Sequence, residues 1–320
     1  MILIISNTND QSTIKVIDWL SFRKAEFLLI TPNDVIELVK IAINGEFVFK
    51  KDDIFYYSND ISSVWYRRGD INLIDLNIDN TTIAGDIRNA LLASLNSELF
   101  TIKEFLYYSL AQKKTLNNYL YSNVNKLVVL RKAKEIGLQI PRTIITTSKK
   151  VLLEFKNDFG SLITKGSSEG SYFRSKDYWF YSYTEKLTDD MINESGESFF
   201  PSLFQKQIQK KFEVRSFYFN DKFYSMAIFS QNNLKTQCDY RKYDHSLPNR
   251  NVPFNLPMEV QRLSRKLMKT LHLDSGSIDF IYGDDDNFYF LEVNPVGQFG
   301  MVSTPCNYYI EKEIAEYLCN

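Results

Sequence analysis

The sequence predicts an α+β fold. Helix-type and strand-type segments alternate in its first third and are mixed in its middle, while its last third is rich in strands with antiparallel hairpin signals. This mixture favours α+β over a doubly wound parallel sheet. The chain has 320 residues, of which 44% are hydrophobic, so two or three compact lobes can each bury a core.

The first region, residues 1 to about 115, is predicted to be an α/β layer. Apolar strands at Ile2 to Ile5 and Phe27 to Ile30 flank an amphipathic helix. The segment TPND, residues 31–34, is typical of a helix entry and predicts a helix through about Ile43. Three further elements are expected: a hairpin at 47–57, a strand at 61–68, and one or two long helices from 81 to about 118.

The second region begins with a well-delimited helix. Asn125 can cap its start, Gly137 can stop it, and Pro141 lies beyond. A strand follows, then a helix from Ser148 to about Asp158, then a buried-type strand that ends at Lys165.

The third region, from about Ser202, is mainly β-structure. Four strand or hairpin segments are expected, with a helix from about Asn255 to Leu271 between them and another helix at the C-terminal end. The strand segments are SLFQKQI, FEVRSFYFN, KFYSMAIFS and the hairpin SIDFIYGDDDNFYFLEVN.

The segment FYFLEVNPVGQFG, residues 288–300, places polar side chains in an otherwise apolar strand. Glu292 and Asn294 are two residues apart, so they share one face of that strand. If residues 284–287 form a four-residue turn, Gly283 faces Phe288, and the ladder then places Asp279 opposite Glu292.

Two neighbouring carboxylates among apolar residues repel each other and lose hydration unless a cation lies between them. The alternative is that a neighbouring strand or an arginine satisfies them by hydrogen bonds. Oxygen ligands without His or Cys suit Mg²⁺ or Mn²⁺, and Mg²⁺ bound in this way usually also holds substrate phosphates. Asp279, Glu292 and Asn294 are therefore candidate metal ligands.

The loop KGSSEGSYF, residues 165–173, has the parts of a phosphate-binding loop. Lys165 ends a strand, and Gly166 and Gly170 follow among small hydroxyl residues whose backbone N–H groups can face an anion. The lysine precedes the glycines, so this is not a P-loop, and an ordinary hairpin turn is the alternative. Glu213 and Arg215 share one face of the strand FEVRSF, which could also be a solvent face.

Composition excludes several classes of function. The 38 Lys and Arg residues balance 39 Asp and Glu residues, so no global charge attracts nucleic acid or a membrane surface. Three cysteines without a CxxC pair, and only two histidines, argue against a disulfide framework and a zinc site. The apolar opening MILIIS is too short for a signal peptide, so we expect a soluble cytoplasmic protein.

The order of these motifs resembles that of the ATP-grasp ligases. The tail LEVNPVGQFGMVSTPCNYYIEKEIAEYL, with VWYRRGD near the start and YRKYD and PNRNVPFNLP between them, is similar to the grasp-with-spasm peptide maturases, relatives of the microviridin-type macrocyclases that make graspetides. The resemblance spans nearly the whole chain. It implies an N-terminal α/β domain resembling a pre-ATP-grasp domain (1–118), a central α+β subdomain (119–203) and a C-terminal antiparallel-sheet subdomain (204–320).

The resemblance also implies roles for single residues. Metal ligation falls to Asp279, Glu292 and Asn294, and catalysis to Lys165, Arg215 and Arg241, the two arginines lying near the γ-phosphate and the activated carboxylate. The implied ATP-binding residues are Lys126, Lys165, the lid residues Gly166, Ser167, Ser168, Gly170 and Ser171, the adenine hinge Gln205, Lys206, Gln207 and Ile208, and Glu213 near the ribose. At the hinge the family usually has an acidic residue where this chain has Lys206.

Four further residues are candidates for binding a substrate carboxylate. Arg67 and Arg68 end a strand and are expected to point to opposite faces, so that one reaches a cleft. Asn249 and Arg250 could do the same beside the active site. Surface ion pairing is the alternative for the two strand-end arginines.

The implied activity is ATP-dependent macrocyclisation of a ribosomal precursor peptide, with a leader and a core, in a homodimeric enzyme that uses ATP and two Mg²⁺ ions, Mn²⁺ being an alternative. An Asp or Glu side chain is phosphorylated by ATP and then joined to a Thr or Ser hydroxyl or a Lys amine of the same peptide. The alternative is an ATP-grasp ligase that adds amino acids such as glutamate to a protein or metabolite. A non-catalytic nucleotide-binding or peptide-carrier module is disfavoured because the lysines, arginines and metal ligands are all present.

Overall fold

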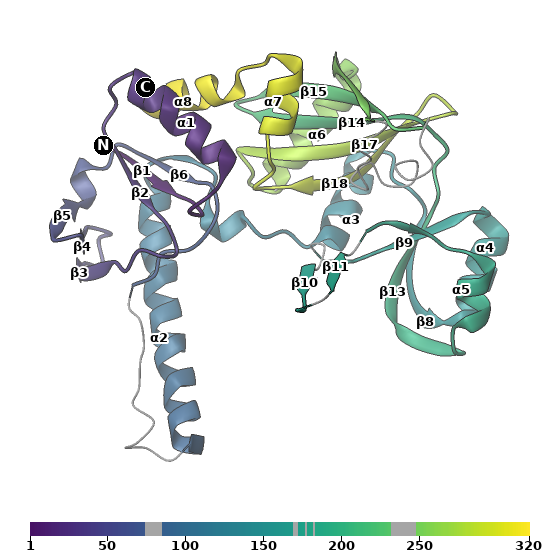
Figure 1. Ribbon diagram of the computed structural model, residues 1–320, viewed down its shortest axis with the longest axis horizontal. Helices are drawn as coiled ribbons and strands as arrows, with labels where there is room; N and C mark the ends of the chain where they lie inside the picture. The colour runs from purple at the N-terminus through teal and green to yellow at the C-terminus, as the bar shows by residue number, and fades with distance from the viewer. Residues whose placement is uncertain (74–84, 169–171, 177, 182, 232–247) are drawn as a thin grey trace.

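The computed structural model describes residues 1–73, 85–168, 172–176, 178–181, 183–231 and 248–320 (Figure 1). Helices and strands are mixed along this part of the chain, which confirms the α+β fold class. None of the helices in these ranges has both the length and the apolarity that a membrane span requires.

The N-terminal sheet has four parallel strands in the order β2-β1-β6-β7. Its strands are β1 (Ile2–Ile5), β2 (Phe27–Ile30), β6 (Ser63–Tyr66) and β7 (Lys114–Leu116). Every residue of β1 and β6 is buried, as expected for parallel strands covered on both faces. Helix α1 (Gln11–Phe22) lies against the C-terminal helix α8 (Ile310–Cys319), so the two ends of the chain share one core (Figure 1).

The prediction of a helix from the segment TPND through about Ile43 is wrong. The carboxylate of Asp34 accepts a hydrogen bond from the backbone N–H of Thr31, three residues earlier, so it closes a turn and does not cap a helix. The apolar residues that follow form an antiparallel sheet with the expected hairpin, because Leu38 pairs with Phe49. This sheet consists of β3 (Glu37–Ile41), β4 (Phe47–Lys51) and β5 (Ile54–Tyr57), followed by a short 3-10 helix at Ser58–Asp60.

A long helix, α2 (Gly85–Ala111), projects away from the rest of the molecule (Figure 1). Only its last turns are buried, through Leu106, Tyr107 and Leu110. The helix is shorter than the predicted span of 81 to about 118, because the chain forms β7 and a 3-10 helix at Tyr119–Tyr121 before residue 122.

The middle of the chain forms a second sheet, in the order β12-β9-β13-β8. Its strands are β8 (Thr143–Ser148), β9 (Leu162–Lys165), β12 (Glu185–Lys186) and β13 (Ser198–Lys206). Helices α4 (Lys149–Phe159) and α5 (Asp189–Glu194) lie on one face, where Leu152, Phe155, Ile192 and Phe204 share a core. A separate two-stranded hairpin joins β10 (Tyr172–Arg174) to β11 (Trp179–Tyr181).

The third large sheet is antiparallel, with strand order β16-β15-β14-β17-β18. Its strands are β14 (Lys210–Phe219), β15 (Lys222–Phe229), β16 (Arg250–Phe254), β17 (Ser275–Gly283) and β18 (Phe288–Asn294). Helix α3 (Lys126–Ile136) and helix α6 (Met258–Thr270) share a core with one face. On the other face, Val302 of α7 (Gly300–Cys306) and Phe299, the residue before this helix, share a core with Phe217 of β14.

The ends of α3 are those expected. The side chain of Asn125 accepts hydrogen bonds from the N–H groups of Leu127 and Val128, and Gly137 ends the helix at a φ of 108°. As a result Lys126 is the first residue of the helix, at a fixed position beside the end of β18.

Candidate active site

The polar side chains singled out in the last hairpin meet as predicted. Asp279 on β17 pairs with Glu292 on β18, and Asn294 lies two residues further along β18. The Asn294 side-chain nitrogen lies 3.4 Å from a carboxylate oxygen of each of the two acids. Three oxygen-bearing side chains therefore converge at one point on the sheet.

A β-bulge produces this pairing. Tyr282 pairs with Phe288 and Phe280 with Phe290, one residue out of step with the predicted Gly283 to Phe288 register. The register then shifts by one residue between Asp279 and Phe280, which restores the predicted partner of Asp279.

The bulge has a clear packing reason. Phe290 and Val293 are 0% and 2% exposed and belong to the same core, although residues three apart on a regular strand face opposite sides. The extra residue allows both to be buried and leaves Glu292 and Asn294 on the polar side.

Cations surround the two carboxylates. The Arg215 Nη1 atom on β14 donates to both carboxylate oxygens of Asp279 at 3.2 Å, and Lys126 Nζ donates to Glu292 at 3.0 Å. An arginine therefore does satisfy one of the acids, as the alternative interpretation of the strand pattern required. The Lys126 side chain is only 18% exposed, although it lies in the first turn of a helix.

The charge state of Glu292 follows from its neighbours. Burial of the carboxyl raises its pKa, but the charges of Lys126 and Lys165, together with hydrogen bonds from Lys126 and Asn294, lower the pKa further, so the net shift is downward. Glu292 is thus held as a carboxylate. The charge of Lys165, the last residue of β9, thus acts on this carboxylate as well.

Lys165 shares a face of the middle sheet with the first residue of the predicted hinge. Lys165 pairs with Leu203, and Gln205, two residues further along β13, pairs with Thr143 on β8. By the two-residue period these side chains face away from Phe204, which lies in the core under α4. Lys165 and Gln205 are therefore presented on the face opposite the helices.

The hinge segment is fixed by backbone hydrogen bonds. The N–H of Lys206 donates to the carbonyl of Arg142 at 2.9 Å, and the N–H of Gln207 donates to that of Ser161 at 2.8 Å. These two N–H groups are committed to the protein, so a nucleobase would meet the carbonyl groups of the hinge or the N–H of Ile208. The exposed side chain of Lys206 is in a position where the resembled family has an acidic residue.

Glu213 precedes Arg215 on the same face of β14. Its carboxylate is buried, pairs with Lys210 and accepts a hydrogen bond from Ser230. The face shared by Glu213 and Arg215 is therefore a buried polar face, and the alternative of a solvent face does not hold.

The remaining candidates lie after β9, at the start of β16 or outside the described residues. Gly166, Ser167 and Ser168 are exposed after β9, Asn249 is half-buried, and Arg250 begins β16 with its guanidinium 5.7 Å from the Phe229 ring. Gly170, Ser171 and Arg241 lie outside the described residues.

The two strand-end arginines do not point to opposite faces, contrary to the prediction. The strand ends at Tyr66, and both guanidinium groups then reach the carbonyl of Val296, Arg67 at 2.5 Å and Arg68 at 3.1 Å. Arg67 is 2% exposed, and burial lowers its pKa to about 10, whereas 35% of the Arg68 side chain is exposed. Arg68 lines a pocket at the C-terminal end of β1.

Sequence reasoning missed Asp10 and Gly297. The Asp10 carboxylate caps α1 and lies 3.3 Å from Arg67 Nη2, a pairing that sequence spacing does not reveal. A Cβ atom at Gly297 would lie 2.2 Å from the Ser277 Oγ atom, so this position needs glycine for close approach of the loop to β17. The Pro295 and Gly297 turn in the sequence was the available signal.

The donor set fits a hard divalent cation only with help from a ligand. Among the described residues no three His, Cys, Asp or Glu side chains form a cluster, so the protein offers two carboxylates and the Asn294 amide. Rotation of that amide would turn its oxygen toward the acids, and Mg²⁺ usually completes its shell with water and substrate phosphates.

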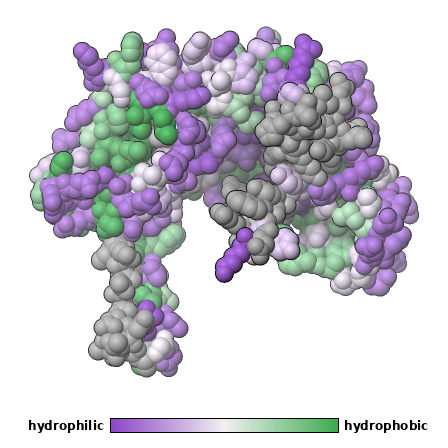
Figure 2. All heavy atoms as spheres, in the orientation of Figure 1, coloured by the Kyte–Doolittle hydropathy of each residue, from purple (hydrophilic) through white to green (hydrophobic). Residues whose placement is uncertain are grey.

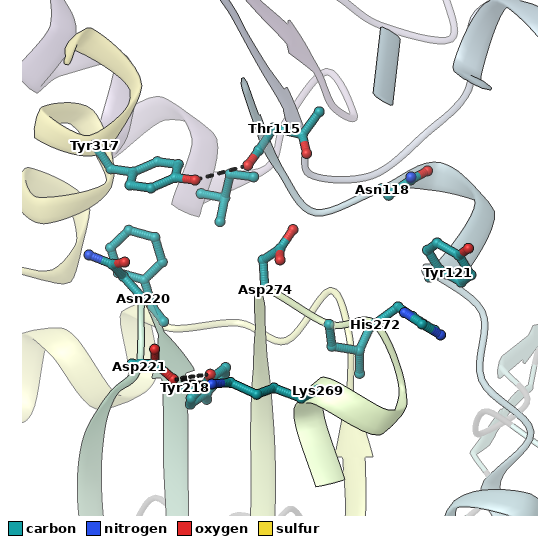
Figure 3. A pocket seen from close by; sticks show the side chains of 13 residues that line it. Thr115, Asn118, Tyr121, Tyr218, Asn220, Asp221, Lys269, His272, Asp274 and Tyr317 are labelled. Atoms are coloured by element: carbon teal, nitrogen blue, oxygen red, sulfur yellow. Dashed lines mark hydrogen bonds and ion pairs between the residues drawn. The ribbon is translucent and has the colours of Figure 1, made fainter. Parts of the chain in front are cut away.

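A separate pocket of about 470 Å³ lies at the far end of β14, between the N-terminal sheet, α6 and α8 (Figure 3). Tyr317 donates to the Thr115 carbonyl at 3.1 Å, and the Tyr218 hydroxyl donates to Asp221 at 2.9 Å. This pocket contains no predicted site residue. The face seen in Figure 2 has a separate hollow, and the coloured residues that border it are mainly hydrophilic.

Comparison with known proteins was informative only at the level of structure. No family model matches the sequence, and no curated protein does. An ATP-grasp ligase of Chryseobacterium gregarium, associated with RiPPs and solved with ADP and a leader and core peptide, superposes with a TM-score of 0.81 at 24% identity, covering 99% of this chain and 96% of that chain.

Two further solved structures also superpose on nearly the whole chain. The macrocyclase MdnC of Microcystis aeruginosa MRC, bound with the precursor peptide MdnA, gives a TM-score of 0.77 at 23% identity over 99% of this chain and 98% of that chain. The ATP-grasp ligase PsnB, complexed with a phosphomimetic variant of its minimal precursor, Mg and ADP, gives 0.71 at 18% identity over 99% and 97%. The whole chain therefore has the ATP-grasp fold, as the sequence motifs implied.

Proposed function

We propose that this protein is an ATP-dependent ligase that forms macrocycles in a ribosomally made precursor peptide. One observation carries the proposal: Asp279, Glu292 and Asn294 converge on the ATP-grasp sheet with Lys126 and Arg215 in direct contact with the acids. Such a combination of oxygen ligands and cations suits a metal-bound triphosphate.

The structural neighbours support the choice of substrates. The Chryseobacterium ligase is complexed with ADP and a leader and core peptide, MdnC is a macrocyclase bound with a precursor peptide, and PsnB is complexed with Mg and ADP. For this chain we infer the same classes of ligand: ATP, Mg²⁺ and a peptide with leader and core. Two Mg²⁺ ions, with Mn²⁺ as a substitute, a homodimer and a cytoplasmic location complete the proposal.

In this proposal the nucleotide lies between the middle sheet and the C-terminal sheet. The hinge Gln205 to Ile208 meets adenine, Glu213 meets the ribose, and Lys126 and Lys165 hold the phosphates. Residues 166–168, 170 and 171 cover them. The proposal also divides the chain into an N-terminal unit (1–118), a central unit (119–203) and a C-terminal unit (204–320).

Asp279, Glu292 and Asn294 would hold Mg²⁺, which supplies charge neutralisation of the phosphates as they react. The protein's own contribution is positional. Arg215 and Lys126, which bond to the acids in this structure, lie where they can transfer those hydrogen bonds to phosphate oxygens when the acids turn to the metal.

The chemistry that follows is carboxylate activation. An oxygen of a peptide Asp or Glu side chain attacks the γ-phosphorus of ATP, the bond to the β-phosphate oxygen breaks, and ADP leaves. A Thr or Ser hydroxyl, or a Lys amine, of the same peptide then attacks the acyl phosphate, loses its proton and expels phosphate. Arg215 and Arg241 would stabilise the charge at the transferring group, and no protein nucleophile is required.

The product mass tests this proposal. The protein is incubated with ATP, Mg²⁺ and the precursor peptide encoded beside it, and the peptide is weighed by mass spectrometry. Macrocyclisation lowers the peptide mass by one water per ring, whereas a ligase that adds amino acids raises it by whole residues. An unchanged mass together with no ADP release would contradict both activities.

A further inference from the structure

A pocket of about 620 Å³ opens at the C-terminal end of β1, next to the loop that follows Asn294. It is lined by the β1–α1 loop and the start of α1, by Arg68, and by the start of α7 with the residues before it. The residues are Asn7, Asn9, Asp10, Gln11, Ser12, Lys15, Arg68, Gln298, Gly300 and Met301.

The charges around this pocket do not cancel. The Asp10 carboxylate is its acidic group, with 5% of its side chain exposed, and it lies 3.3 Å from the buried Arg67 and 3.7 Å from Arg68. Arg67 therefore neutralises Asp10, and the charges of Arg68 and Lys15 remain in excess. Because the pocket also lies at the start of α1, the helix dipole adds to this positive potential.

Arg68 has donors left for a ligand. Its Nη2 atom donates to the Val296 carbonyl at 3.1 Å, while the 3.7 Å separation between its Nε atom and Asp10 is too long for a hydrogen bond. A guanidinium has five N–H donors in a planar fork, so the contact with Val296 orients Arg68 without exhausting it. Lys15 is similarly held by Thr304 at 2.9 Å, which leaves further ammonium hydrogens.

The pocket lies close to the proposed metal site. Val296, which both arginines contact, is two residues beyond Asn294, and Gln298 lines the pocket while its carbonyl accepts from Ser277 on β17 at 3.5 Å. A peptide whose reacting carboxylate lies at Asp279 and Glu292 can therefore reach this pocket with its neighbouring residues.

We propose that this pocket binds a second, non-reacting carboxylate of the peptide substrate, an Asp or Glu side chain close to the one that is activated. Arg68 is its bidentate partner and Lys15 adds a second cation. The Val296 carbonyl orients Arg68, and Arg67 neutralises Asp10. The inference rests on the proposed function and identifies which part of the peptide the N-terminal sheet recognises. If Arg68 served only as the surface partner of Asp10, the buried Arg67 would not be needed to neutralise that carboxylate.

The test measures peptide binding and nucleotide binding separately. Fluorescence anisotropy with a labelled core peptide, and calorimetry with AMPPNP and Mg²⁺, are applied to Arg68→Met, Arg68→Lys, Lys15→Met and the control Lys40→Met. Lys40 is an exposed lysine on β3, outside both sites. Losing a charge-assisted pair weakens binding about tenfold or more. We expect that loss of peptide affinity in Arg68→Met, a smaller loss in Arg68→Lys and in Lys15→Met, none in Lys40→Met, and unchanged affinity for AMPPNP in all four.

A peptide series identifies the carboxylate. Each Asp or Glu of the core is replaced by Asn or Gln, and one such peptide should bind wild-type protein weakly while showing no further loss with Arg68→Met. Equal peptide affinity of wild type and Arg68→Met, or additive losses for every peptide, would overturn the inference. If the wild-type protein binds both AMPPNP and the peptide and Arg68→Met binds the peptide equally well, the inference fails alone, whereas a wild-type protein that binds AMPPNP but not the peptide also contradicts the proposed macrocyclase. If it binds neither, the proposed function fails with it.

Discussion

Arg215 and Asp279 face each other across β14 and β17, and a single guanidinium nitrogen lies 3.2 Å from both carboxylate oxygens. Both side chains are largely buried, with 11% and 14% exposed. In the proposed enzyme this pair would exchange partners: Asp279 would help to hold the metal, and Arg215 would bond to the phosphates.

Asp279→Asn should abolish turnover and leave the fold intact. The amide can still accept a hydrogen bond from Arg215, so the pair is not lost, but it no longer supplies the negative charge that a metal ion requires. Circular dichroism and the melting temperature report the fold, and ADP release with peptide reports turnover. Near-normal ADP release would remove Asp279 from the set of metal ligands.

Arg215→Met should destabilise the metal-free protein. Removing one partner of a buried ion pair leaves an uncompensated carboxylate and typically costs about 3 to 5 kcal/mol. We expect a lower urea midpoint and a partial recovery when Mg²⁺ and AMPPNP are added. The double variant Arg215→Met with Asp279→Asn is the control, and it should be more stable than Arg215→Met alone. A double variant that is the less stable of the two would contradict the pairing.

Glu292 should make stability depend on acid pH. Its pKa is lowered in the folded protein, so its contribution is complete above the unfolded-state pKa and is lost as pH falls through the folded-state value. Urea unfolding between pH 6 and pH 3, roughly the range around a glutamate pKa, should therefore show a steeper loss for wild type than for Glu292→Gln. Identical slopes would show that Lys126 and Lys165 do not hold this carboxylate charged.

Gly297→Ala should displace the loop that carries Val296. Its Cβ atom would lie 2.2 to 2.6 Å from Ser277 side-chain and backbone atoms, so the loop must move. We expect a destabilisation of about 1 to 3 kcal/mol by overpacking, with reduced turnover. Gly85→Ala is the matched control, since nothing lies within 4 Å of a Cβ there. A variant as stable and active as that control would refute the close approach.

The two-residue period of a strand placed Glu292 and Asn294 on one face correctly, but the position of Asp279 opposite Glu292 was predicted correctly only because two one-residue shifts cancelled. The predicted turn was one residue out of step, and the bulge beside Phe280 compensated for it. The bulge could not be predicted from a local sequence pattern. It allows Phe290 and Val293 to be buried in one core, which depends on the tertiary packing. The position of Asp279 opposite Glu292 was therefore correct, although the pairing on the turn side was not.

Local sequence patterns gave wrong predictions where contacts between distant parts of the chain determine the structure. The turn at Thr31 to Asp34 looked like a helix start, but Leu38 and the residues beside it pair with β4. Likewise the contact of Lys126 with Glu292 joins positions 166 residues apart, which periodicity cannot detect. The motif order implied that both residues belong to the nucleotide site, Lys126 at the phosphates and Glu292 at the metal, but it did not predict their direct contact.

The most direct test is calorimetric titration of AMPPNP, with Mg²⁺ and then with EDTA, into wild-type protein and the double variant Asp279→Asn with Glu292→Gln. Wild type should bind the nucleotide in a Mg²⁺-dependent manner, and the double variant should lose that dependence while retaining its melting cooperativity. Mg²⁺-dependent binding of equal strength in both proteins would contradict the assignment of these acids to the metal and its triphosphate.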